Sequence, residues 1–206
     1  MQVVDFEVSN KLMAKYKILT PRTVFVKLEK EAQKAAKNFG FPVFLKIYGK
    51  NILHRTEIKG VGEAKDKSEL GKMFSEMMKI KGTEGILIQE KVQGKELIIG
   101  MKRDAQFGVV IMAGIGGILA ELISDFVLRV APVSENEALK MLAELKGYPY
   151  LQGKRDKNPI NFKEAAKVIA ALSEMGLKEA EIKEITLNPV IVNEKKAVTV
   201  DFKLLK

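Results

Sequence analysis

The feature that most constrains the fold is the stretch from residue 86 to 130, in which short apolar runs alternate with tight turns. The turns contain Gly, Asp or Ser and are short, as at Gln93-Gly94 and Ser124-Asp125. Strands at this spacing, joined by turns this short, form an antiparallel sheet. The strands expected in this stretch cover residues 86–92, 96–102, 107–113, 118–123 and 126–130.

Helical patterns lie on both sides of this stretch, because apolar residues there recur three and four positions apart. They predict helices over 9–17, 29–39, 69–80, 134–145 and 161–175. Further strands are expected at 23–28, 43–48, 182–192 and 197–202, and the last two should form a hairpin through 193–196. The sequence therefore predicts an α+β fold over 1–206, with a smaller lobe (20–84) and a larger lobe (85–206 with 1–19).

The composition indicates a globular protein with a packed core, because 47% of the 206 residues are hydrophobic. No run of about 18 apolar residues is present, so we expect no membrane span. The N-terminus lacks the basic and apolar pattern of a secretion signal, so the cytoplasm is the expected location. With no cysteine, disulfides, thiolate metal sites and thiol catalysis are excluded.

The net charge of +9 raises the possibility of a nucleic-acid partner. However, the lysines are spread along the predicted helices among glutamates, and no basic run is interleaved with aromatic residues. This pattern favours a solvated lysine-rich surface, or small anionic ligands such as nucleotides. We therefore expect no nucleic-acid partner.

Two residues near the strand at 43–48 point to chemistry on an anion. Lys46 lies among apolar residues of that strand, and a buried lysine is costly unless a negative group meets it. His54, in the following loop, is the only histidine and can act as a nucleophile near neutral pH. The alternatives are a lysine at a sheet edge and a solvent-exposed histidine without a role.

Polar residues and glycines at strand ends form a second group of candidates. Gly116 and Gly117 lie in a glycine cluster that fits neither a P-loop nor a dinucleotide fingerprint. The cluster is either a tight turn or a place where backbone amides approach a phosphate. If the hairpin at 193–196 forms, Asn188 and Asp201 could each give one oxygen to a Mg²⁺ ion. Alternatively, each such polar side chain is only a surface group.

Taken in order, these segments resemble the ATP-grasp β subunit of ADP-forming acetyl-CoA synthetase, and the resemblance covers nearly the whole chain. The matching segments are 40–47, 52–57, 86–104, 106–108, 114–117, 129–132, 147–155, 187–192 and 200–201, with Glu121 and Asp125 between them. The resemblance implies an ATP-grasp fold, in which two lobes hold the nucleotide between sheets. It also implies the reversible reaction of acyl-CoA, ADP and phosphate to a carboxylic acid, ATP and CoA.

The resemblance also implies roles for individual residues. Lys46 should contact nucleotide phosphate, and Glu96 the ribose or the adenine edge. The segment Glu90, Lys91 and Val92 should form the hinge beside adenine. Gly116 and Gly117 follow in family order and stay candidates for nucleotide binding. Asn188 and Asp201 should hold Mg²⁺, and His54 should accept the phosphoryl group and pass it to ADP. A CoA-binding α subunit is the implied partner, in an α2β2 assembly.

The chain departs from the family pattern at a few positions. Thr186 stands where the family has an acid, and Lys59 stands where it has a glycine. Because the acid supports the catalytic site, a diverged subunit that binds ATP without catalysis is one alternative. A succinyl-CoA synthetase-like ligase subunit is another, although a histidine in the 49–57 loop favours the acetyl-CoA synthetase branch.

Overall fold

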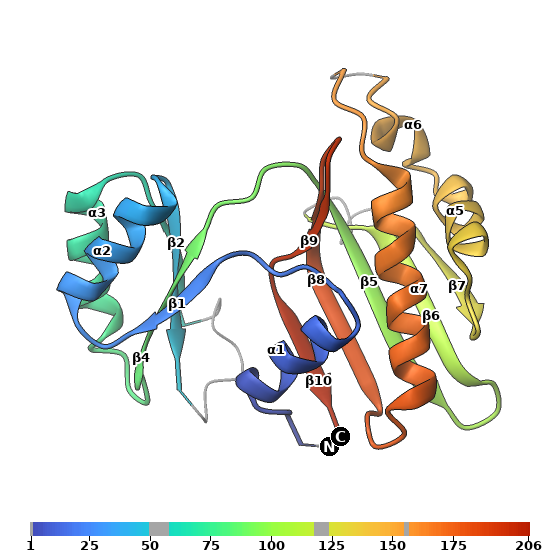
Figure 1. Ribbon diagram of the computed structural model, residues 1–206, viewed down its shortest axis with the longest axis horizontal. Helices are drawn as coiled ribbons and strands as arrows, with labels where there is room; N and C mark the ends of the chain where they lie inside the picture. The colour runs from blue at the N-terminus through green and yellow to red at the C-terminus, as the bar shows by residue number, and fades with distance from the viewer. Residues whose placement is uncertain (1, 50–57, 118–123, 155–156) are drawn as a thin grey trace. The chain divides into compact units, whose positions relative to one another are not determined.

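The computed structural model describes residues 2–49, 58–117, 124–154 and 157–206, and it divides into two compact units (Figure 1). The smaller unit is Pro21–Lys91, and the larger combines Met1–Thr20 with Val92–Lys206. Each contains its own sheet, and each sheet has its own hydrophobic core. The α+β class expected from the sequence is confirmed.

The smaller unit is a four-stranded antiparallel sheet with helices on one face. Along the strand Val43–Tyr48, the alternating residues Val43, Leu45 and Ile47 are fully buried. They belong to the same hydrophobic core as Ala32 and Leu70 of the two helices. In sheet order the strands are β1 (Thr23–Val26), β4 (Gly85–Glu90), β2 (Val43–Tyr48) and β3 (Val61–Ala64), and the helices are α2 (Glu29–Phe39) and α3 (Lys67–Met77).

Strand β4 corrects the boundary expected between the lobes. The glycines at 82 and 85 suggested that the larger lobe begins at residue 85, but β4 pairs with both β1 and β2 in the smaller sheet. Its residues from Gly85 to Gln89 are all buried, as expected for a strand in the middle of a sheet. The chain passes to the larger unit only after Lys91.

The larger unit is built on a six-stranded antiparallel sheet, with α5 and α7 packed together on one face (Figure 1). Its main strands follow the order β10 (Phe202–Leu205), β8 (Glu184–Val192), β5 (Lys95–Asp104), β6 (Gly108–Ile115) and β7 (Phe126–Val130), and β9 (Ala197–Thr199) pairs with β8. Its helices are α1 (Phe6–Lys15), α5 (Glu135–Glu144), α6 (Tyr148–Leu151) and α7 (Phe162–Lys178).

Most predicted elements are confirmed with shifted ends, and two short ones were missed. Neither a strand at β3 nor a helix at α6 was expected from the sequence. The predicted hairpin turn is present, since Asn193 N donates to Lys196 O at 3.0 Å. The strand expected at 118–123 lies outside the described residues.

The face of the larger sheet away from α5 and α7 carries exposed apolar side chains at its β7 edge. Phe126, Leu128 and Val130 alternate along β7 and are each about half exposed.

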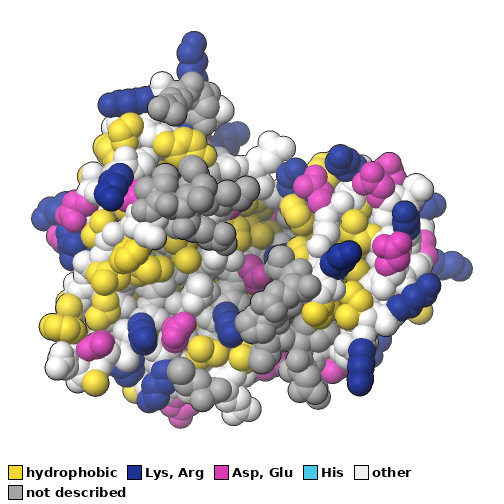
Figure 2. Space-filling model, turned by 180° about the vertical axis from the view of Figure 1, so that it is seen from behind, with side chains coloured by type: hydrophobic (Ala, Val, Ile, Leu, Met, Phe, Trp, Pro, Cys, Tyr) yellow, Lys and Arg dark blue, Asp and Glu magenta, His cyan; other side chains and the backbone are white. Residues whose placement is uncertain are grey.

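Figure 2, the view from behind, shows Lys and Arg interspersed with Asp and Glu, so the described residues form no continuous basic tract on the face seen there. None of the helices in the described part of the chain combines the length and apolar character needed to cross a membrane.

We predict that Ser173→Ala destabilises the larger unit. Ser173 is 1% exposed, and its hydroxyl accepts a hydrogen bond of 2.9 Å from Val133 N just before α5. Removing that acceptor leaves a buried N–H unsatisfied, which costs about 1–3 kcal/mol. Urea unfolding should show this loss, whereas Ser68→Ala at an exposed position on α3 should stay within about 0.5 kcal/mol. Equal effects of the two substitutions would contradict the prediction.

We also predict that Glu179 makes stability depend on acid pH. One of its oxygens accepts from Lys15 Nζ at 2.7 Å and from Tyr16 Oη at 2.8 Å, and these bonds lower the pKa of Glu179. A lowered pKa stabilises the fold above the unfolded value of about 4.3, and this stabilisation is lost as pH falls through the folded value. Urea unfolding between pH 6 and 3 should therefore show a smaller loss for Glu179→Gln than for wild type.

Lys15→Met provides the matched test, because it removes the largest cause of the lowered pKa and leaves the carboxylate in place. It should also reduce the acid dependence. Wild-type, Glu179→Gln and Lys15→Met proteins that lose stability in parallel as the pH falls would rule out this contact as the cause.

Candidate functional site

An irregularity that crosses neighbouring strands of the larger sheet forms the centre of the candidate site. Leu97 on β5 pairs with Val190 on β8, yet Ile99 pairs with Leu187, so the two residues 188 and 189 oppose the single residue 98. On the other side of β8, β9 ends and β10 begins at the same level. Such bulges bend a strand and re-aim side chains, often beside functional sites.

Asn188 and Asp201 lie together at this irregularity, as the predicted hairpin requires. Asn188 N donates to Asp201 O at 3.0 Å, and the Asp201 carboxylate accepts from Phe202 N at 2.9 Å. The Asn188 side chain is exposed and that of Asp201 is partly exposed. Two neighbouring oxygen donors, one of them charged, fit an ion such as Mg²⁺ that takes its other ligands from phosphate and water.

Among the described residues no group of three or more His, Cys, Asp or Glu side chains is placed to hold a metal ion. A site that completes its metal coordination with protein carboxylates alone is therefore excluded for that part of the chain. The arrangement at residues 188 and 201 instead suits a metal that is shared with an anionic ligand.

Glu96 and the two glycines form a second part of the site on the same sheet. Gly116 N donates to Glu96 O at 2.8 Å. A Cβ on Gly116 would lie 2.9 Å from the backbone carbon of Leu97, and a Cβ on Gly117 would lie 2.7 Å from Glu96 Oε2. Gly117 also has a φ of 71°, in the left-handed region that favours glycine. The glycines thus let this turn pack directly against Glu96.

Lys46 lies in the smaller unit on an internal strand, since β2 is flanked by β3 and β4. It pairs with Val61 and Leu87 and is only 5% exposed. Because Leu45 and Ile47 face the helices, alternation directs the Lys46 side chain to the other face of the sheet. The alternative of a lysine at an exposed edge is therefore wrong, and the expectation of a buried cation is confirmed.

The hinge segment at the end of β4 has both of its charged side chains in ion pairs within the smaller unit. Glu90 accepts from Arg22 N at 3.0 Å and from Arg22 Nε at 2.6 Å. Lys91 Nζ lies 2.9 Å from Glu63 Oε1. Val92 is half-buried and begins the larger unit. These contacts fix the end of β4, which was not evident from the sequence.

The histidine expected to carry phosphate, His54, lies outside the described residues. The described chain resumes at Ile58, and Lys59 has a φ of 55°. A side chain in the left-handed region costs about 1–2 kcal/mol, which gives a physical reason for the glycine that the resemblance implies at this position.

The remaining acids at strand ends have structural contacts or are not described. Asp104 accepts from Gln106 N and Phe107 N in the β5–β6 turn, and these bonds lower its pKa. Asp125 is 7% exposed and accepts two backbone hydrogen bonds. Glu121 lies outside the described residues. Asp104 is thus a turn residue and is not part of the candidate site.

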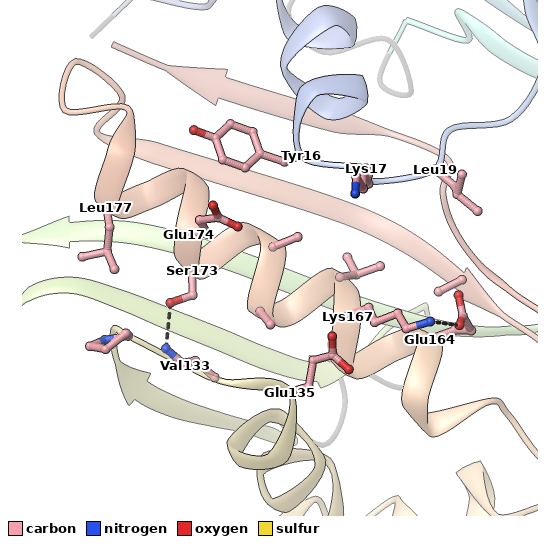
Figure 3. Close-up of a pocket in the computed structure, with 15 residues that line it drawn as sticks. Tyr16, Lys17, Leu19, Val133, Glu135, Glu164, Lys167, Ser173, Glu174 and Leu177 are labelled. Carbon is pink, nitrogen blue, oxygen red and sulfur yellow. Dashed lines mark hydrogen bonds and ion pairs between the residues drawn. The ribbon is translucent and has the colours of Figure 1, made fainter.

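A groove of about 690 Å³ lies along α7, between α1 and the start of α5 (Figure 3). Its lining includes Val168 and Ser173, and two other lining residues, Lys167 and Glu164, form an ion pair at 2.6 Å. None of the predicted site residues that the structure describes lines this groove. It is therefore distinct from the candidate site.

Comparison with known proteins gives the same family over nearly the whole chain. The ATP-grasp domain family matches residues 2–205. The β subunit of acetate–CoA ligase [ADP-forming] I from Pyrococcus furiosus is 34% identical over 206 residues, covering 96% of this chain and 89% of that protein. Acetate–CoA ligase [ADP-forming] I from Archaeoglobus fulgidus is 37% identical over 183 residues, which are 85% of this chain but 27% of that longer protein.

Solved structures agree with this assignment. Acetyl-coenzyme A synthetase 1 from Ca. Korarchaeum cryptofilum, in complex with coenzyme A and Ca-AMPCP, superposes with a TM-score of 0.91 at 33% identity, covering 99% of this chain and 93% of that chain. A second structure of that enzyme holds Mg-AMPPCP, with a phosphohistidine segment pointing towards the nucleotide-binding site. The ATP-grasp fold expected from the sequence is confirmed.

We predict that alanine at the two glycines destabilises the protein through different contacts. Gly116→Ala places a Cβ against the backbone of Leu97 and Glu96, which cannot move aside. Gly117→Ala meets the carboxylate end of Glu96, which can rotate, and adds left-handed strain of about 1–2 kcal/mol. Thermal unfolding should show both losses in the wild-type background.

The matched control is Glu96→Ala, which removes the flexible carboxylate and keeps the strand backbone. In that background Gly117→Ala should lose the clash part of its effect, whereas Gly116→Ala should keep its full effect. Identical behaviour of the two glycine variants in both backgrounds would contradict this reading of the turn.

Proposed function

Because the chain belongs to the ATP-grasp family, within the group of ADP-forming acyl-CoA ligase β subunits, we propose that it is the nucleotide-binding, phosphate-transferring subunit of such a ligase. The observation that carries this proposal is the strand irregularity that brings Asn188 and Asp201 together on the sheet that also holds Glu96. An enzyme that transfers phosphate needs charge neutralisation and positioning, and these residue types provide both.

The proposed reaction has three steps, the last two of which occur on His54. On the partner subunit, phosphate displaces CoA from an acyl-CoA and forms an acyl phosphate. A ring nitrogen of His54 then takes the phosphoryl group, and the carboxylate of the acid leaves. An oxygen of the ADP β-phosphate next attacks the phosphohistidine, so that ATP forms and the imidazole returns to its neutral state. Neutral imidazole suits both steps near pH 7.

Nucleotide binding in this proposal uses the residues that the resemblance implies. The buried ammonium of Lys46 would neutralise phosphate charge, and Glu96 would accept hydrogen bonds from the ribose or the adenine edge. Since the Glu90 and Lys91 side chains are ion-paired, the contacts of this segment to adenine fall to its main chain. A Mg²⁺ ion held by Asn188 and Asp201 would offset the charge on the transferring phosphate.

The proposed partner is a CoA-binding α subunit, in an α2β2 assembly. Two relatives of similar length are named as β subunits. Other relatives contain the matching region as 27–29% of a longer chain, which fits a fusion of the two parts. The half-exposed apolar residues of β7 are of the kind that subunit interfaces cover.

We predict that His54→Asn abolishes ATP formation and leaves nucleotide binding intact. Asparagine is close in size to histidine but cannot carry a phosphoryl group under these conditions. The assay combines the chain with an α subunit of this family, acetyl-CoA, ADP and labelled phosphate. Wild-type protein should gain an acid-labile phosphate label, and because His54 is the only histidine, that label identifies the site. MgADP binding, measured by calorimetry, is the control.

Two outcomes would contradict the proposal. ATP formation that survives His54→Asn would exclude this residue as the phosphate carrier. Wild-type protein that binds MgADP but forms neither ATP nor the label would indicate the non-catalytic alternative, in which Thr186 replaces a needed acid.

A further inference from the structure

A buried lysine next to Glu96 has no part in the function proposed so far. Lys95 is the first residue of β5 and is 5% exposed. Its ammonium donates to the carbonyl oxygen of Tyr150 on α6 and lies 4.1 Å from the centre of the Tyr150 ring. The ammonium thus holds the start of β5 to one short helix through two kinds of contact.

The same helix is held to the sheet from its other end by Asp125. The two oxygens of this buried carboxylate accept from Lys146 N at 2.9 Å and from Gly147 N at 2.7 Å, directly before α6. A Cβ on Gly147 would lie 2.8 Å from a side-chain carbon of Ile115, so the chain packs closely against the end of β6 there. Helix α6 is therefore fixed between Lys95 and Asp125.

These contacts close into a ring around the base of the glycine turn. The main-chain oxygen of Asp125 accepts from Ile115 N at 3.1 Å, and the next residue, Gly116, donates to Glu96 O at 2.8 Å. Glu96 is bonded in sequence to Lys95, whose side chain leads back to α6. Every link in this ring joins described residues of the larger unit, and Glu96 and Gly116 are members of it.

Lysine at this position contributes more to the orientation of the ring residues than to the free energy of unfolding. Removing an ammonium from water is costly, and an apolar residue that fills the same space often gives an equally stable or more stable protein. Groups that hold a binding residue in a fixed orientation, however, lower the ordering cost of binding its ligand. Lys95 therefore has the character of a residue kept for geometry.

We propose that Lys95 is a positioning residue for nucleotide binding, which acts through Tyr150 and Asp125 to hold Glu96 and the Gly116–Gly117 turn in place. This inference rests on the proposed function, because it needs Glu96 to contact the nucleotide. It assigns Lys95 no contact with the ligand. Its effect is on the affinity for nucleotide and is separable from its effect on stability.

The test measures MgADP binding to the full chain by calorimetry, with thermal unfolding of each variant alongside. Lys95→Met keeps the length of the stem and removes the charge, and it should weaken binding about tenfold, as loss of a supporting residue commonly does. Lys95→Arg keeps a cation that can bond the carbonyl and stack on the ring, so it should stay within about threefold of wild type.

A double-mutant cycle with Asp125→Asn tests the ring itself. The amide replaces one acceptor oxygen by a donor, which breaks one of the two bonds that hold α6. If both residues act through α6, the double variant should weaken binding by much less than the product of the two single effects. If the double variant instead weakens binding by the full product of the two single effects, the ring does not connect the two residues.

The outcomes separate this inference from the proposed function. Wild-type chain that binds no MgADP overturns the proposed function, and the inference fails with it. Wild-type chain that binds, with a folded Lys95→Met variant of unchanged affinity, overturns the inference alone. If Lys95→Met does not fold, Asp125→Asn decides the question, because a folded Asp125→Asn variant with wild-type affinity would also overturn it.

Discussion

The candidate site depends on one main-chain hydrogen bond, from Asn188 N to Asp201 O. In a regular sheet, residues of neighbouring strands alternate between the two faces, and a one-residue slip would turn either side chain away. Here the bulge in β8 and the break between β9 and β10 fall at the same level, and Asn188 lies beside Asp201 there. The arrangement proposed to hold the ion therefore comes from strand pairing and not from a loop.

Much of this arrangement could be predicted from the sequence, because local patterns specify it. The turn at 193–196 is short and polar, so the pairing of the last strands follows from it, and Lys46 lies in an apolar run typical of an internal strand. Strand β4 was placed in the wrong lobe because an apolar strand pattern does not reveal which sheet it joins. Strand β3 and helix α6 were missed since each has only four residues and tertiary packing stabilises them.

The glycines show a different limit of sequence reasoning. A cluster such as Gly114–Gly117 indicates that side chains are excluded, but it does not say by what. In the structure the excluded volume next to Gly116 and Gly117 belongs to β5 and Glu96. The ring through Lys95 and Asp125 could not be predicted from the sequence either, because its members lie far apart in sequence and no local pattern links them.

Thr186 bears on how a metal ion would enter the proposed site. It lies two residues before Asn188 on β8 and pairs with Gly100 and Lys203 on the neighbouring strands. With threonine there, Asp201 supplies the one formal charge of the pair proposed to hold the ion, and a pair with so little charge binds a strongly hydrated ion weakly. We therefore expect Mg²⁺ to arrive already bound to the nucleotide, whose phosphates supply the missing negative charge. Because Thr186 is neutral and lies beside Lys203, this end of the sheet would attract an anion more strongly than it would with an acidic residue at position 186.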